Sequence, residues 1–233
     1  MSFEKSEMLN QYFQNQPKSI SAIVDFDKHS DRLFPFDFTR NNKSLDPQTY
    51  SDTIAFSQWI SSSLAENNCR YGIGGYNEHR IIYSRSGLFN AVEEPRRLHL
   101  GVDIWGPEGT NVFSPIDGVI HSFNFNNNFG DYGATLLLEH DLNELKFYSL
   151  YGHLSLKSIS NLKKGNSVRK GDRIAEFGNS LENGHWPPHL HFQLIFDMQN
   201  MEGDFPGVCQ YSQRQTYLNN CPDPEIILKH TFR

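Results

Sequence analysis

From about residue 70 onward, glycine and asparagine turn residues separate a series of short, β-rich runs. The runs are RIIYS, HLGVDIW, GVIHSF, ATLLLEH, KFYSLYGHL, RIAEFG and HLHFQLIF. Several short strands divided by turns are typical of an antiparallel sheet or barrel and argue against a βαβ fold. The pattern therefore predicts a mainly β architecture for most of the chain.

Two segments inside this region resemble each other. GTNVFSPIDGVI and LKKGNSVRKGDRIAEFG each combine a glycine turn with a strand and a second glycine turn. A pattern that recurs within one chain indicates a repeated structural unit. We expect these segments to form loosely matched halves of one β architecture.

One helix is predicted before the β region. Asp46 followed by Pro47 has the form of an N-cap with proline at the first helical position. Apolar residues recur at helical spacing after it, namely Phe56, Trp59, Ile60 and Leu64. We expect this helix to end near Asn67.

The remaining segments are expected to pack around the β region. The first 45 or so residues show no lasting periodicity and predict an arm lying on the domain, with one strand from Ile20 to Phe26. The segment after Phe196 is rich in turn residues but keeps apolar side chains, so it is also expected to pack on the domain. The predicted organisation is an arm and helix at 1–94, a β domain at 95–198 and a C-terminal extension at 199–233.

The composition makes nucleic acid and membranes poor partners. The net charge is −6, and no run of Lys or Arg is longer than a pair. No window approaches the roughly 18 apolar residues that suggest a spanning helix, and the first residues lack the apolar core of a secretory signal. The 3 cysteines are an odd, scattered set. We expect a soluble protein of a reducing cytoplasm, with a secreted or periplasmic location as the alternative; no oligomeric state is predicted.

The first indication of chemistry is the sequence His189-Leu190-His191. Side chains alternate between the faces of a strand, so both imidazoles point the same way, roughly 6 to 7 Å apart at the backbone. Apolar residues would occupy the opposite face, namely Leu190, Phe192 and Leu194. Taken alone, the pair also fits two half-exposed strand histidines that bind nothing.

His99 and Asp103, in HLGVDIW, form a second candidate pair. On a straight strand they would share a face but lie about 13 Å apart. Both could reach one metal only if the chain bends between them, and Gly101 permits a bulge or turn there. The alternative is a surface histidine and a turn aspartate.

Two histidines and one carboxylate suit a catalytic metal. Such a set leaves the fourth tetrahedral position of zinc open for water, whereas structural zinc more often uses cysteines. The same ligands also suit other borderline divalent ions. His153, at the end of the run KFYSLYGHL, would overlook a cleft, although a lone histidine is more often structural or exposed.

Three motifs, HLGVD, YGHLS and PHLHF, occur in this order with glycine-rich strands between them. Over residues of about 95 to 197 they resemble the lysostaphin-type family of zinc metallopeptidases. The resemblance implies that His99, Asp103 and His191 bind one zinc ion and that His153 and His189 are catalytic. It also implies a β-sheet groove or barrel-like sandwich of the duplicated-hybrid-motif type, to which the pattern after Asp46 adds at least one helix in the N-terminal part.

The other histidines have no paired spacing and are expected to be structural or exposed. They are His29, His79, His121, His140, His185 and His230, of which His185 is nearest to the motifs. Trp186 and the pair Pro187-Pro188 precede the last motif and are expected to form a wall of the substrate groove.

The leading hypothesis is a zinc metallopeptidase that hydrolyses a peptide bond through an activated water. Its peptide substrate would be glycine-containing or of the cell-wall type. The alternative is a non-catalytic metal-binding module that recognises peptides or regulates a partner. All five matching positions are present, which favours the enzyme. A cell-wall hydrolase exported by a route not visible in the sequence is a third possibility, and an N-terminal arm that blocks the groove is a further one.

Overall fold

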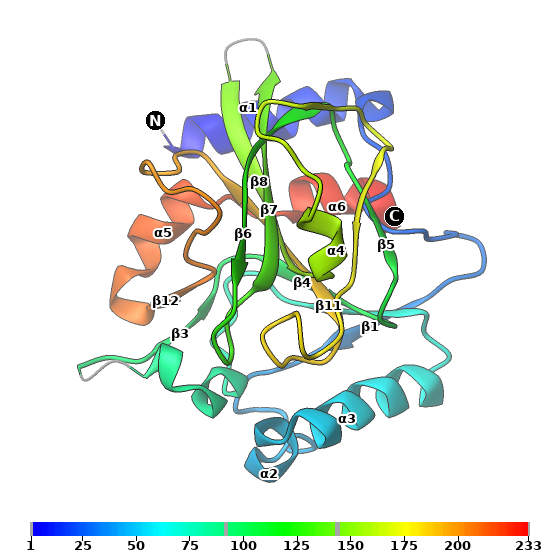
Figure 1. Cartoon of the computed structure of the whole chain (residues 1–233), viewed down its shortest axis with the longest axis vertical. Helices are drawn as coiled ribbons and strands as arrows, with labels where there is room; N and C mark the ends of the chain where they lie inside the picture. The colour runs from blue at the N-terminus through cyan, green and yellow to red at the C-terminus, as the bar shows by residue number, and fades with distance from the viewer. Residues whose placement is uncertain (1, 91–92, 143–144, 233) are drawn as a thin grey trace.

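The computed structural model describes residues 2–90, 93–142 and 145–232, and most of their strands form one eight-stranded sheet (Figure 1). Its order is β1 (Leu33–Phe36), β2 (Tyr71–Gly74), β4 (Val102–Trp105), β11 (His189–Ile195), β8 (Leu145–Leu154), β7 (Gly133–Leu142), β6 (Gly118–Asn126) and β9 (Ser167–Val168). Neighbouring strands are antiparallel except for the parallel pair β1 and β2. The predicted mainly β fold is confirmed.

Two smaller sheets complete the β structure of the described residues. They pair β5 (Asn111–Phe113) with β10 (Arg173–Glu176) and β3 (Arg96–His99) with β12 (Val208–Gln210). The segments expected to be related halves therefore contact each other twice, through β5 with β10 and through β6 with β9.

Helices lie mainly before and after the β region. They are α1 (Ser2–Asn15), α2 (Pro47–Ser51), α3 (Thr53–Glu66), α4 (Leu156–Ile159), α5 (Arg214–Asn220) and α6 (Glu225–Phe232), with 3-10 turns η1 (Pro17–Ser19), η2 (Ile82–Arg85), η3 (Gly87–Phe89) and η4 (Tyr211–Gln213). A helix in the N-terminal part was expected and is confirmed. Within the described ranges, no helix combines the length and the apolar character needed to cross a bilayer.

The single helix expected after Asp46 is two helices. Asp46 caps α2 by accepting a hydrogen bond from the Thr49 nitrogen at 2.8 Å, as its position predicted. Asp52 has extended backbone angles and accepts from the Ala55 nitrogen, also at 2.8 Å. This second cap starts α3 and interrupts the continuous helix that the apolar spacing had suggested.

Two further predictions were wrong. The strand expected at Ile20–Phe26 contributes only an isolated bridge between Val24 and Val112, and the arm instead contains α1 and β1. The sequence gives little sign of α1, because the side chains that it buries in the core are two, Leu9 and Phe13, among its described residues. The run RIIYS is not a strand, and its last three residues belong to the 3-10 turn η2 (Ile82–Arg85).

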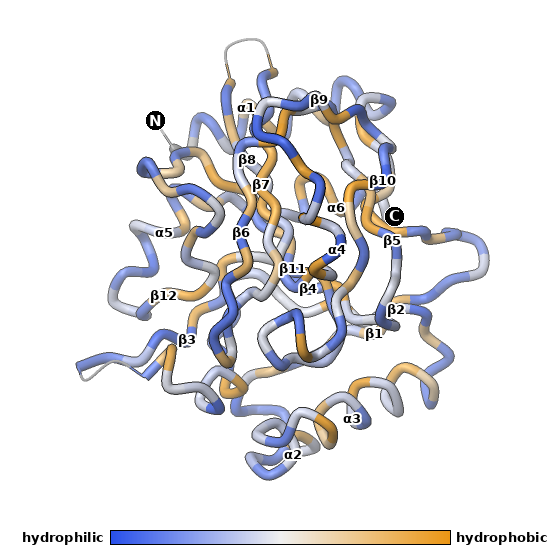
Figure 2. The backbone as a smooth tube through the Cα atoms, viewed as in Figure 1, coloured by the Kyte–Doolittle hydropathy of each residue, from blue (hydrophilic) through white to orange (hydrophobic). Residues whose placement is uncertain are grey.

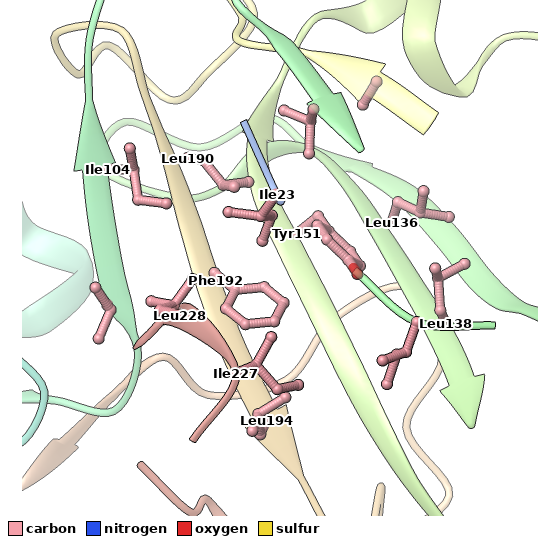
Figure 3. Close-up of a cluster of buried hydrophobic side chains, with 14 of the residues drawn as sticks. Ile23, Ile104, Leu136, Leu138, Tyr151, Leu190, Phe192, Leu194, Ile227 and Leu228 are labelled. Atoms are coloured by element: carbon pink, nitrogen blue, oxygen red, sulfur yellow. The ribbon is translucent and has the colours of Figure 1, made fainter. Parts of the chain in front are cut away.

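The main core lies on one face of the large sheet. Leu190, Phe192 and Leu194 of β11 point into it, and Ile227 and Leu228 of α6 pack against them (Figure 3). Leu9 and Phe13 of α1 belong to the same cluster, so both ends of the chain share this core. Hydrophobic residues accordingly recur along the strands, while the outer loops are mainly hydrophilic (Figure 2). The division into segments 1–94, 95–198 and 199–233 remains a proposal. All three segments contribute side chains to this one core.

Candidate metal centre

The chain bends between His99 and Asp103, as the spacing of these residues required. His99 ends β3, which pairs with β12, and Asp103 lies in β4 of the large sheet. A Cβ atom on Gly101 would lie 2.6 Å from Cε1 of His191 and 2.7 Å from the carbonyl oxygen of Phe192. Gly101 is therefore needed because any side chain there would overlap the site.

The bend brings the three predicted ligands together. Nε2 of His99 lies 2.9 Å from Nδ1 of His191 and 3.2 Å from Oδ1 of Asp103. Nδ1 of His191 lies 3.0 Å from the same carboxylate oxygen. All three side chains are buried, and they form the one group of three potential metal-binding residues found within the described ranges.

The outer hydrogen bonds of the two imidazoles fix their tautomers. His99 donates from Nδ1 to the carbonyl oxygen of Gly75 at 2.9 Å, so its Nε2 carries no proton when the ring is neutral. His191 donates from Nε2 to Oε1 of Gln193 at 2.9 Å. Gln193 is held in that orientation because its amide nitrogen donates to the carbonyl oxygen of Pro206 at 3.2 Å. The unprotonated Nδ1 of His191 therefore faces the unprotonated Nε2 of His99.

This donor set fits a cation. Two nitrogen lone pairs and a carboxylate oxygen converge on one point, an arrangement that is repulsive unless a positive charge lies between them. Ligand atoms about 2.0 to 2.2 Å from tetrahedral zinc lie about 3.3 to 3.6 Å from one another. The observed separations of 2.9, 3.0 and 3.2 Å are slightly shorter than that spacing.

Burial and nearby charge keep His99 and Asp103 in the forms that bind metals. Burial lowers the pKa of His99 to about 3, and Arg80 acts in the same direction. Burial alone would raise the pKa of Asp103, but its surroundings, including the ion pair with Arg80, hold it well below its usual range. A neutral imidazole and an ionised carboxylate are the forms that bind metals.

His153 and His189, the two predicted catalytic residues, lie side by side with ring centroids 4.0 Å apart. His189 also stacks on Trp105, with ring centroids separated by 3.9 Å. His153 donates from Nδ1 to the carbonyl oxygen of Asn183 at 2.8 Å, and His189 donates from Nδ1 to that of Pro187 at 2.7 Å. Burial lowers the pKa of His189 to about 4 and that of His153 well below its ordinary value. Both rings are neutral near pH 7, with Nε2 able to accept a proton.

The backbone at His153 adopts a left-handed conformation, with φ at 62°. Such a conformation costs roughly 1 kcal/mol or more for a residue other than glycine and is common at functional sites. It is held on both sides, because the His153 nitrogen donates to the Tyr132 carbonyl at 2.8 Å and its carbonyl accepts from Gly178 at 2.9 Å. His153 thus lies near the end of β8 with its ring centroid 6.3 Å from that of His191.

A cavity of about 230 Å³ opens beside the centre, lined by Asp103, His153, His189 and His191. Trp186 forms one wall, as expected, whereas Pro187 and Pro188 are absent from its lining within the described residues. Other walls come from the segments 82–89 and 204–208. Residues 2–68 contribute nothing to the lining, so the arm gives no support for a blocked groove.

Several contributors to the centre were not found by sequence reasoning. Arg80 is fully buried and contacts Asp103, but one arginine in NEHRIIYS gives no sequence signal. The glycine-rich run YGIGGY provides the Gly75 carbonyl that orients His99. His185, near the last motif in sequence, lies against Phe129 with ring centroids 5.4 Å apart and is outside the ligand group.

A mainly β fold with a buried group of two histidines and one aspartate beside a cavity defines a candidate metal-dependent hydrolase. Residues 97–202 match the model of Peptidase family M23. Residues 97–202 are thus similar to this family, and the resemblance seen in the motifs is confirmed.

Two curated relatives are similar to this region. An uncharacterized metalloprotease of Haemophilus influenzae is 37% identical over 140 residues, which cover 57% of this chain and 27% of that protein. The DD-carboxypeptidase/endopeptidase Mpg of Neisseria meningitidis is 35% identical over 131 residues, or 54% of this chain and 28% of that protein. The chain thus spans about a quarter of the length of the curated relatives it matches. The matched family and the names of these relatives are those of metallopeptidases, a class of hydrolases.

Solved structures of related proteins also match. The catalytic domain of lysostaphin from Staphylococcus simulans is 25% identical and has a TM-score of 0.45, covering 74% of this chain and 97% of that chain. A zinc-containing peptidase from Vibrio cholerae is 31% identical with a TM-score of 0.34, covering 42% of this chain and 27% of that chain.

Proposed function

We propose that the chain is a zinc metallopeptidase that hydrolyses a peptide bond with an activated water. His99, Asp103 and His191 would bind one zinc ion per chain, and His153 and His189 would carry protons during hydrolysis. The convergence of three unprotonated donor atoms, with separations of 2.9 to 3.2 Å, is the observation that carries the proposal.

The choice of zinc is supported by the kind of ligands present. Imidazole and carboxylate ligands that leave one position open are typical of catalytic zinc. The hydrogen bonds from His99 to Gly75 and from His191 to Gln193 provide the outer support that metal-binding histidines usually have. Bound zinc would polarise the scissile carbonyl and lower the pKa of water toward about 7.

The two remaining histidines would supply acid and base catalysis. Their Nδ1 atoms are occupied by the carbonyl oxygens of Asn183 and Pro187, so Nε2 is the atom that exchanges protons. Because burial keeps both imidazoles neutral, either can take a proton from the attacking water and later deliver one to the leaving nitrogen. Trp186 and Tyr132 line the cavity beside them and restrict access of bulk water.

The proposed substrate is a short peptide segment, glycine-containing or of the cell-wall type. A cavity of about 230 Å³ admits an extended peptide segment with small side chains and excludes a folded chain. The family and the name of the Neisseria relative support this class. A cytoplasmic location stays a prediction, with a secreted or periplasmic location as its alternative.

The proposal is tested by incubating the zinc-loaded full chain with glycine-rich peptides and cell-wall peptides and detecting new amino termini by mass spectrometry. His189→Ala and His153→Asn should retain metal and lose at least about 100-fold in cleavage rate. Asparagine is chosen at position 153 because it tolerates the left-handed backbone there. His121→Ala, on a half-buried residue outside the cavity, is the matched control.

The outcomes separate the enzyme from its main alternative. Cleavage lost in both variants and kept in the control supports the proposed roles. Stoichiometric zinc with no cleavage of either peptide class would instead favour a non-catalytic binding module. Cleavage that survives in both variants would remove His153 and His189 from the mechanism.

A further inference from the structure

Arg80 is a charged side chain inside the centre that the proposed mechanism does not use. Its side chain is 0% exposed, and its guanidinium bonds to Oδ2 of Asp103. Its Nε atom donates to Oε2 of Glu78 at 2.6 Å, and its Nη2 atom donates to the carbonyl oxygen of Gly75 at 3.2 Å. The planar guanidinium can make these contacts at once because its donors are held in a fixed fork.

The fold provides space for this guanidinium. A Cβ atom on Gly74 would lie 2.7 Å from Nη2 of Arg80, so a side chain at that position would displace the arginine. On another side, the guanidinium carbon lies 5.2 Å from the ring centroid of Phe38. A buried guanidinium is costly unless it is fully paired. Its partners, two carboxylates and a carbonyl, meet that requirement.

Because Arg80 pairs with Asp103, the two carboxylate oxygens of Asp103 have different partners. Oδ2 is occupied by Arg80, whereas Oδ1 faces Nε2 of His99 at 3.2 Å and Nδ1 of His191 at 3.0 Å. Only Oδ1 is therefore directed at the point where the donor atoms converge. The Gly75 carbonyl accepts from Arg80 and from Nδ1 of His99, which links the orientations of two ligands through one atom.

We propose that Arg80 is a positioning residue of the metal centre, which holds Asp103 so that one carboxylate oxygen alone binds the metal. The inference rests on the proposed metal site. Glu78, Gly75 and Arg80 all lie before residue 97, where the family match begins. The N-terminal part of this chain thus completes the centre from outside the matched segment.

The test measures metal binding by the full chain with cobalt and zinc alone, without any substrate. Arg80→Lys keeps the charge but cannot reach Asp103, Glu78 and Gly75 together. Zinc affinity, measured by competition with a chelator, should fall about 10- to 100-fold. The visible absorption of bound cobalt should weaken, because a released carboxylate can offer both oxygens and raise the coordination number.

Two further variants keep the test decisive. Glu78→Gln leaves Arg80 in place but removes the carboxylate charge paired with it, so it should also lower zinc affinity even if Arg80→Lys fails to fold. Arg96→Lys makes the same chemical change at another residue that lines the cavity. It should leave zinc affinity within about twofold of the wild type.

The outcomes separate this inference from the function on which it rests. Folded Arg80→Lys and Glu78→Gln variants with wild-type zinc affinity and cobalt absorption would overturn the role of Arg80 and leave the metal site standing. Lower thermal stability with unchanged cobalt absorption would likewise reduce Arg80 to a structural residue. A wild-type chain that binds neither metal would overturn both proposals.

Discussion

Each of the four histidines at the centre has one ring nitrogen bonded to an oxygen acceptor. The acceptors belong to Gly75, Asn183, Pro187 and Gln193. Because a carbonyl oxygen can only accept, each bond fixes which ring nitrogen carries the proton. At the residue scale, the chemistry of the site is therefore set by the groups behind the imidazoles as well as by the imidazoles themselves.

Gly101→Ala should damage both the fold and the metal site. The added methyl group would lie 2.6 Å from Cε1 of His191 and 2.7 Å from the carbonyl oxygen of Phe192. Moving that oxygen would distort the backbone of β11, which is paired with strands on both sides. We expect a loss of about 1 to 3 kcal/mol in the free energy of unfolding of the metal-free protein. Urea denaturation measures it. Gly87→Ala is the matched control, since a Cβ there meets nothing within 4 Å; equal stability of the two variants would contradict the steric account.

The sequence predicted the five site residues but not the residues that support them. His189 and His191 were found because strand alternation places them on one face, and His99 and Asp103 because a glycine between them allowed a bend. Their convergence is observed, while their roles stay proposals. Arg80 and the Gly75 carbonyl had no sequence signal, because their importance depends on contacts between distant segments.

At the scale of elements, the break between β3 and β4 is what allows His99 and Asp103 to lie close together. His99 belongs to the small sheet with β12, and Asp103 to the large sheet beside β11. Strand patterns predicted the central strands well, since their alternation is set by a buried face. They failed for RIIYS, where Ser84 bonds back to the carbonyl oxygen of Ile81 at 2.7 Å and supports a 3-10 turn.

His140 on β7 makes the fold sensitive to acid. It donates from Nδ1 to the Asp117 carbonyl at 2.8 Å, and its Nε2 lies 2.6 Å from the Ser149 hydroxyl on β8. Burial lowers its pKa from 6.5 to about 4. Between these values the unfolded chain binds a proton that the folded chain does not, so stability falls as pH falls, by up to about 1.4 kcal/mol per pH unit.

His140→Gln should weaken the pH dependence of the free energy of unfolding by the equivalent of about one proton per chain. Urea denaturation of the metal-free protein at several pH values between about 7 and 4 provides the measurement, and linkage converts the slope into a proton number. His29→Gln, on an exposed residue, serves as the control. An unchanged slope in His140→Gln would show that His140 is not the group protonated on unfolding.

At the scale of the whole molecule, the two ends of the chain stabilise the domain that holds the site. Leu9 and Phe13 of α1 and Ile227 and Leu228 of α6 are all 0% exposed and belong to the core cluster of the large sheet. The sequence predicted that both ends pack on the domain. It did not predict α1, since two anchors in one short segment do not establish a helical period.

Leu228→Ala should destabilise the whole chain. Removing a fully buried leucine side chain costs about 2 to 5 kcal/mol, and the loss should lower the midpoint of one cooperative transition. Thermal unfolding followed by circular dichroism tests this expectation. Leu181→Ala is the matched control, because Leu181 is 76% exposed. A variant in which α6 alone melts, with the sheet unaffected, would show that the C-terminal extension is independent of the core.

The central claim is that His99, Asp103 and His191 form a zinc site. Its most direct test is the metal content of the purified full chain, by native mass spectrometry, for the wild type, His191→Ala and the control His121→Ala. We predict close to one zinc per chain in the wild type and in the control, and none in His191→Ala. A wild-type chain that remains metal-free after exposure to zinc, or a His191→Ala variant that keeps its zinc, would contradict the account.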